Sequence, residues 1–178
     1  MGPAAPSSIN VVQSGPIHSI TVEFTGLTHT FPDDPDILLV GPTGASVILV
    51  SDTGGNLDLL NVSLVFSSTA LLSLPDGNGV TSGTFLPTNF GSLDVFSSPA
   101  PPGPYGDSLD VFQELAASGT WRLFTQDDLS GDGGSLAAWS LTIRTEDTSN
   151  VPEPGSTTLL VMGCALLWLA RRRNTACQ

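Results

Sequence analysis

The sequence predicts an all-β domain, an antiparallel sandwich of the jelly-roll type, over residues 1–146. Short apolar runs rich in β-branched residues lie between turn signals, and Ser19–Phe24 alternates strictly between apolar and polar side chains. That period of two is typical of a half-buried strand. The 19 Gly and 14 Pro residues recur between the runs, and this spacing favours a sandwich. The other predicted strands are Ile9–Val12, Ile37–Val40, Val47–Val50, Asn61–Phe66, Leu109–Phe112, Thr120–Thr125 and Leu136–Ile143.

Three further features of the sandwich follow from local sequence. Ser108–Ala117 has the best helical periodicity, so we expect a short helical turn there. Asn89–Asp107 is rich in Pro, which cannot supply ladder N–H groups, and we expect it to pack across one end of the sandwich. Trp121 and Trp139 lie on predicted strands, which favours core packing over a sugar-stacking platform.

The chain is strongly acidic, with 17 Asp and Glu against 5 Lys and Arg and a net charge of −12. Phosphate backbones are bound by clustered Lys and Arg, so the composition argues against a nucleic-acid partner. For most of the carboxylates, solubility is the preferred interpretation over cation recruitment. Cys164 and Cys177 both lie beyond the predicted sandwich, which therefore contains no disulfide.

The composition changes abruptly at Asp147. Residues 147–158 form a polar linker, residues 159–173 hold an apolar run and an Arg cluster, and residues 174–178 form a tail. The apolar run is short for a bilayer span, which needs about 20 residues, but the Arg cluster supplies a positive-inside stop. We therefore expect a transmembrane helix, with a buried terminal helix as the alternative. The linker contains Val151, Pro152, Glu153 and Pro154, and the cluster is Arg171, Arg172 and Arg173.

Motif, apolar run and Arg cluster, in this order, closely resemble the PEP-CTERM sorting signal of exported proteins. The resemblance departs only in the extra residues Asn174–Gln178. It implies processing by an exosortase, a membrane protease-transpeptidase of Gram-negative bacteria that make exopolysaccharide. The implied route is anchoring in the inner membrane, then release to the cell surface or extracellular matrix, with exopolysaccharide or surface matrix as a partner.

Residues 8–145 resemble the P domain, or Homo B domain, that follows the catalytic domain of subtilisin-like proprotein convertases. Departures occur at Asp33, Pro35 and Gly41, and the middle, Asp52–Ser118, is poorly matched. The resemblance implies a jelly-roll sandwich that stabilises a neighbouring protease, and a serine-endopeptidase label inherited without the chemistry. Two runs of residues carry it: His29, Thr30, Asp34, Ile37, Leu39, Pro42 and Gly44, then Gly119, Trp121, Leu123, Gly134, Leu136, Trp139 and Leu141.

The residues do not predict catalysis. A nucleophilic serine needs a neighbouring base and a group that orients the base. Only His18 and His29 could serve as that base, and neither accompanies a nucleophile-elbow motif. Two His residues far from two Cys residues in the tail also give no zinc-ligand spacing. We therefore assign no catalytic residue.

Calcium is the one cofactor for which the sequence offers candidate ligands. Hard cations bind carboxylate and carbonyl oxygens, and carboxylates crowd two loops that flank predicted strands. Ordinary acidic turns, in which Asp side chains cap loop N–H groups, are the alternative for each loop. The candidate ligands are Asp33, Asp34, Asp36 and Asp52 around the first loop, and Asp127, Asp128 and Asp132 in the second.

Two functions remain open on the sequence. The first is a non-catalytic exported surface or matrix module, sorted through the C-terminal signal. The alternative is an accessory P domain of a subtilisin-like endopeptidase, separated from its catalytic domain or a remnant of one. Met1–Pro6 leads directly into domain-like sequence without a signal peptide, which we interpret as a truncated start; a cytoplasmic protein with an orphaned tail is the other interpretation.

Overall fold

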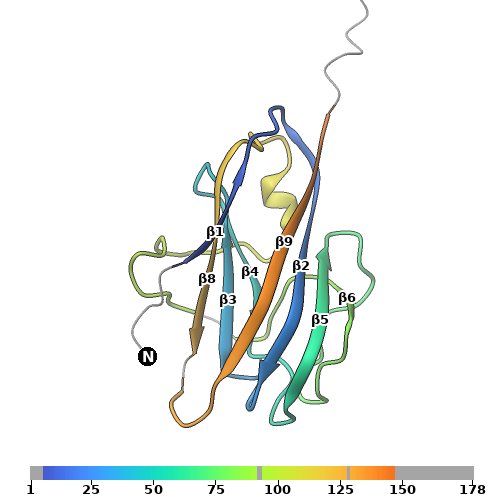
Figure 1. Cartoon of the computed structure of the whole chain (residues 1–178), viewed down its shortest axis with the longest axis vertical. Coiled ribbons are helices and arrows are strands. Elements are labelled where there is room, and N and C mark those ends of the chain that lie inside the picture. Colours follow the sequence, from blue (N-terminus) through green and yellow to red (C-terminus); the bar gives the residue numbers. More distant parts are fainter. Residues whose placement is uncertain (1–5, 92–93, 128, 147–178) are drawn as a thin grey trace, which may run out of the picture. The chain divides into compact units, whose positions relative to one another are not determined.

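The computed structural model describes residues 6–91, 94–127 and 129–146. The chain divides into two units, Met1–Glu146 and Asp147–Gln178, and all the described residues belong to the first. They form an all-β domain of two sheets (Figure 1), as the sequence predicts. None of the helices in this part of the chain is long and apolar enough to cross a bilayer. The predicted apolar helix lies outside the described residues.

The two sheets contain five and four strands. The first has the order β1-β8-β3-β4-β7 and the second β6-β5-β2-β9. Most pairs are antiparallel; β4–β7 and β5–β6 are parallel. The strands are β1 (Ser7–Val11), β2 (Ile17–His29), β3 (Pro35–Val40), β4 (Ser46–Ser51), β5 (Leu59–Ser67), β6 (Gly83–Phe85), β7 (Thr88–Asn89), β8 (Gly119–Asp127) and β9 (Gly134–Thr145).

Strand β2 is the centre of the four-stranded sheet because it pairs with both β5 and β9. In a regular strand the side chains on one face are an even number of positions apart. Phe24 and Leu27 are both buried although they are three positions apart, so the alternation is interrupted between them. A register shift between these two residues absorbs the extra position, and Gly26 adopts a φ of 68° there. A side chain at Gly26 would be strained in this conformation and would contact Ala137 of β9. The bulge therefore sets which side chains of the second half of β2 face the core.

The main core lies between the two sheets and joins apolar residues of both. Trp121 of β8 is fully buried in it, its ring centroid lies 4.9 Å from that of Phe112, and its Nε1 donates to the Ala117 carbonyl at 3.0 Å. Trp139 of β9 is only half-buried, and its Nε1 donates to Ser7 Oγ at 2.7 Å. Both indoles thus pack against the core, as the sequence predicts, although Trp139 is enclosed less completely than Trp121.

The segment Leu109–Phe112 forms a short 3-10 helix, η1, rather than the predicted strand. Ser108 caps it by accepting from the Asp110 N–H. In a 3-10 turn residues i and i+3 share a face, so Leu109 and Phe112 are both buried in the core. The alternative expectation of a helical turn within Ser108–Ala117 is therefore the correct one.

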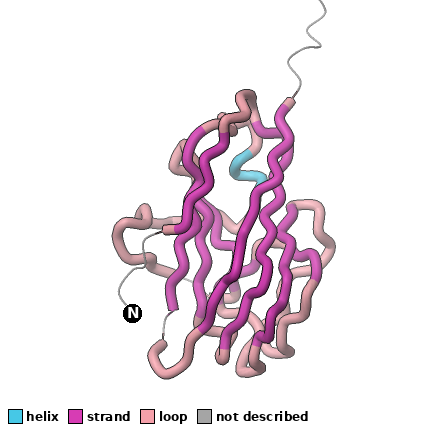
Figure 2. Tube along the Cα trace, in the orientation of Figure 1, coloured by secondary structure: helices cyan, strands magenta, loops and turns pink. Residues whose placement is uncertain are grey.

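The Pro-rich loop, residues 94–107, covers the outer face of the five-stranded sheet rather than one end of the sandwich (Figure 2). Phe96 of this loop is buried on a second apolar cluster with Leu38, Val40, Ile48 and Phe124. Gln126 of β8 holds the loop by donating to the Val95 carbonyl and accepting from the Ser97 N–H. Apolar side chains of β3, β4 and β8 point outward from this sheet, and the loop shields them from water, which explains its placement.

Strands β6 and β7 are too short for periodicity to predict them.

The unequal burial of the two indoles generates a prediction about stability. Trp121→Ala should lower the free energy of unfolding by about 3–5 kcal/mol, because it leaves a cavity in the core. Trp139→Ala should lower it by less, since the core encloses that ring only in part. Urea unfolding of residues 6–146, followed by circular dichroism, measures both. Equal losses for the two variants would contradict the burial pattern.

Candidate metal centre

Two loops that are far apart in the sequence meet at one end of the sandwich. The β2–β3 loop supplies Asp34, and the β8–β9 segment supplies Asp127 and Asp132. One carboxylate oxygen from each of these residues lies within 4.8 Å of the others. Asp34 is buried and the other two are half-buried. We refer to Asp34, Asp127 and Asp132 as the acidic cluster.

Strand pairing in both sheets brings the acidic cluster together. In the five-stranded sheet, Pro35 at the start of β3 pairs with Asp127 at the end of β8. In the four-stranded sheet, His29 at the end of β2 pairs with Gly134 at the start of β9. The connections β2–β3 and β8–β9 therefore leave the sandwich side by side, and each passes from one sheet to the other.

Hydrogen bonds between Thr30 and Gly133 lock the two loops together. The Thr30 N–H donates to the Gly133 carbonyl at 3.2 Å, and the Gly133 N–H donates to Thr30 Oγ1 at 3.2 Å. This reciprocal pair fixes the position of Asp132, the residue before Gly133, relative to the β2–β3 loop. Thr30, one of the residues on which the P domain resemblance rests, thus joins the two loops. The sequence alone did not indicate this role.

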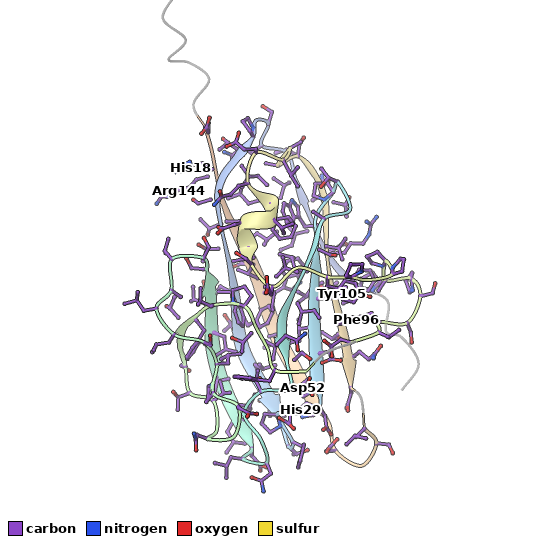
Figure 3. The ribbon with its side chains drawn as sticks, turned by 180° about the vertical axis from the view of Figure 1, so that it is seen from behind. His18, His29, Asp52, Phe96, Tyr105 and Arg144 are labelled. Carbon is purple, nitrogen blue, oxygen red and sulfur yellow. The ribbon has the colours of Figure 1, made fainter. Side chains whose placement is uncertain are left out.

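His29 is buried beside the acidic cluster at the end of β2 (Figure 3). Its Nδ1 lies 2.8 Å from the Phe31 carbonyl oxygen, and its Nε2 lies 3.7 Å from Asp127 Oδ2. Gly134 packs directly against the His29 ring, where a β-carbon would overlap the ring and the Thr28 carbonyl. The imidazole is therefore fixed between its own loop and β9, and it faces a carboxylate of the cluster.

The carboxylates of the cluster repel one another. The pKa of Asp34 is raised to about 6, and burial is the largest cause. The charge of Asp132, a hydrogen-bonding contact with Asp132 and the charge of Asp127 raise it further, in this order. His29 acts in the opposite direction. Asp34 Oδ2, Asp127 Oδ1 and Asp132 Oδ1 are also buried without a hydrogen-bond partner. Buried polar atoms are normally satisfied, and a cation or water among the three side chains would satisfy these oxygens.

The donor set fits calcium better than zinc. Calcium binds six to eight oxygens at about 2.3–2.6 Å, so ligands on opposite sides of the ion lie up to roughly 5 Å apart. The cluster oxygens lie within 4.8 Å of one another and therefore fit inside that span. Zinc prefers nitrogen and sulfur ligands, whereas Nδ1 of His29 is already occupied by Phe31. Asp34, Asp127 and Asp132 would hold the ion, with second carboxylate oxygens and water completing the coordination.

The other candidate ligands lie elsewhere. Asp33 is half-buried outside the cluster, and Asp36 is buried in β3 opposite Gln126 of β8. Asp52 follows β4 with a φ of 51° and accepts from Ser51 Oγ at 3.2 Å. Ser51 Oγ also donates to Asp94 Oδ1, and Asn89 Nδ2 donates to Asp94 Oδ2. The sequence did not indicate that Asp94 and Asn89 take part in this network. Asp128, Val151–Pro154 and Arg171–Arg173 lie outside the described residues.

The fold and this centre define a small all-β domain with an acidic, oxygen-only site built from two loops. No family model matches the chain, and no curated protein matches it. A solved structure of the Aeromonas sobria serine protease with its chaperone is 17% identical, with a TM-score of 0.46 over 83% of this chain and 24% of that one. The protease alone is 17% identical, with a TM-score of 0.42 over 78% and 22%. This chain thus spans about a quarter of the length of these proteins.

Calcium should stabilise the domain by binding the native state. We expect the melting temperature to rise by roughly 5–10 °C when free calcium is about 100 times its Kd. Asp34→Asn should remove most of this shift, whereas Asp33→Asn, a change next to the cluster, should leave it intact. Scanning calorimetry with calcium and with EGTA measures the difference. No shift at millimolar calcium would identify the loops as plain acidic turns.

Without calcium, Asp34 should make the domain less stable as the pH rises. Its folded-state pKa of about 6 lies above the ordinary 3.8, so the folded state holds this proton more tightly than the unfolded state. The stability from this group is fully present below about pH 4 and is lost as the pH rises through about 6. In EGTA at pH 7.5, Asp34→Asn should therefore raise the free energy of unfolding, by on the order of 2 kcal/mol. A loss of stability under these conditions would contradict the repulsion.

Proposed function

We propose that residues 6–146 are a non-catalytic accessory module of an exported protein, held rigid by calcium at the acidic cluster. The observation that carries this proposal is the cluster itself. Three carboxylates converge with buried, unpartnered oxygens at the junction of two loops. A cation there would cross-link the two loops and thereby the two sheets, which is a stabilising task rather than a chemical one.

The environment of both histidines supports a non-catalytic module. His29 contacts the Phe31 backbone and Asp127, and His18 lies 3.9 Å from Glu146 at the other end of the sandwich (Figure 3). Within residues 6–91, 94–127 and 129–146, no serine or threonine hydroxyl hydrogen-bonds to either imidazole. Serine hydrolases require such a pair, although it can be loose without substrate.

The residues of the sandwich favour the accessory P domain as the setting of this module. The positions that resemble the P domain perform structural tasks here: Trp121 fills the core, His29 supports the acidic cluster, and Thr30 joins two loops. A domain that stabilises a neighbouring protease needs rigidity and no active site of its own. The serine-endopeptidase association would then belong to the neighbour.

The C-terminal sequence supports the other setting, a surface or matrix module processed by an exosortase. This proposal rests on the PEP-CTERM-like order of motif, apolar run and Arg cluster beyond residue 146. The two settings are compatible with a shared export route. The adjacent DNA distinguishes them: an in-frame subtilisin-like domain upstream favours the protease partner, and an in-frame signal peptide alone favours the surface module.

The module by itself should hydrolyse no peptide substrate. Purified residues 6–146 should also fail to react with a fluorophosphonate probe, because no base activates a serine hydroxyl. Gel fluorescence against a known serine hydrolase checks the reaction. Stoichiometric labelling that His29→Ala abolishes, while His18→Ala leaves it intact, would make the domain an enzyme.

The tail should be processed only where an exosortase is present. The chain, fused to a functional signal peptide, is expressed in matched hosts with and without the enzyme. Cleavage near Val151–Pro154 should appear only with the enzyme, and Pro152→Ala combined with Glu153→Ala should block it. Mass spectrometry of the membrane and secreted fractions measures the product. Equal processing in both hosts would remove the sorting-signal interpretation.

A further inference from the structure

One sheet edge of the sandwich is long and open. Three of the edge strands are short: β1, β6 and β7 contain 5, 3 and 2 residues. The fourth, β9, contains 12 residues and pairs, within the described chain, with β2 alone. An unpaired strand presents a row of backbone N–H and C=O groups that can pair with another strand.

Strand β9 lacks the features by which proteins usually protect such an edge. Charged side chains, proline and short length discourage strand pairing. Between Gly134 and Thr145 the only charged residue is Arg144, which lies near the end of the strand, and there is no proline. Residues Ser135–Ser140 carry only small or apolar side chains. This half of the edge is therefore open to an incoming strand.

A groove of about 850 Å³ lies beside this half of β9. It occupies the opening between the two sheets, with apolar lining from Leu27, Ile37, Leu123 and Leu136. Its other wall comes from β8, whose pairing with β1 ends at Leu123. Trp139 lines the groove, and its Nε1 bond to Ser7 Oγ connects the two edges across the opening.

The shape of this region fits an extended peptide. A strand added to β9 would continue the four-stranded sheet and place alternate side chains on opposite faces. One set would enter the apolar groove, and the other would face solvent. Strand addition of this kind takes its affinity from backbone hydrogen bonds and its specificity from pockets for alternate side chains.

The negative charge of the chain favours a peptide with positively charged side chains. Asp127 lines the groove, and the whole chain carries a net charge of −12. A basic segment is attracted to this surface, whereas a second copy of the same acidic chain is repelled. We propose that the β9 edge and its groove bind an extended, basic segment of another protein, with alternate apolar residues, by antiparallel or parallel strand addition.

The test uses a defined peptide and two matched variants of the domain. The probe is a fluorescein-labelled nine-residue peptide that alternates valine and threonine and has an arginine at each end. Ala138→Arg changes an exposed alanine on the groove, and Ala116→Arg changes an exposed alanine at the other end of the sandwich. The first should weaken binding about tenfold or more through charge repulsion, and the second should change it less than about twofold. Fluorescence anisotropy in EGTA, where no cation offsets the charge of Asp127, measures both.

Four further measurements test the proposal. Replacing the arginines of the peptide by glutamate, or N-methylating alternate backbone amides, should abolish binding. Hydrogen exchange should show that the bound peptide protects the amides of Gly134–Ser140. The proposal is overturned if the basic peptide does not bind, if the acidic or methylated peptide binds equally well, or if Ala138→Arg has no effect. Sedimentation that shows a dimer with protected β9 amides would make a second copy the occupant and would also overturn it.

Discussion

The pairing of β2 with both of its neighbours is the constraint on which this domain depends. This 13-residue strand lies in the interior of the four-stranded sheet and places apolar side chains into the core along its whole length. The bulge at Gly26 then shifts the inward face by one position, so that Leu27 and His29, rather than their neighbours, are buried. Without that shift, the imidazole of His29 would face solvent, and the acidic cluster would lose the group packed beside it.

The same pairing explains why the candidate metal centre lies at one end and the proposed peptide site along one edge. Because β2 leads into β3 and β8 leads into β9, two connections cross between the sheets at the same end. Their side chains form the acidic cluster. Among the described strands β9 has only β2 as a neighbour, its inner side chains are half-buried, and the space between the sheets opens beside it. A cation at the cluster would therefore stiffen the end of the groove lined by Asp127.

Local sequence was a good guide wherever one strand has one buried face. Ile20, Val22 and Phe24 alternate, and the structure buries all three. It was a poor guide at Leu109–Phe112, where an apolar run fits a strand as well as a 3-10 turn. The acidic residues show the same limit. Asp34 and Asp132 were recognised as candidate ligands of two separate loops, and nothing in their spacing indicates that these loops meet. A pattern search cannot distinguish Asp33, which lies outside the cluster, from Asp34, which lies in it.

The sequence by itself determined the all-β class, most strand positions, the acidic character and the order of motifs in the tail. These properties follow from period-two patterning, turn residues and composition, all of which act over a few neighbouring residues. Only the tertiary structure decided that three carboxylates converge, that Trp139 is half-buried while Trp121 is enclosed, and that β9 is an edge strand among the described residues. Each of these depends on which strands pair. Pairing is set by the global packing of two sheets, which brings carboxylate oxygens of residues more than 90 positions apart, such as Asp34 and Asp127, within 4.8 Å of each other.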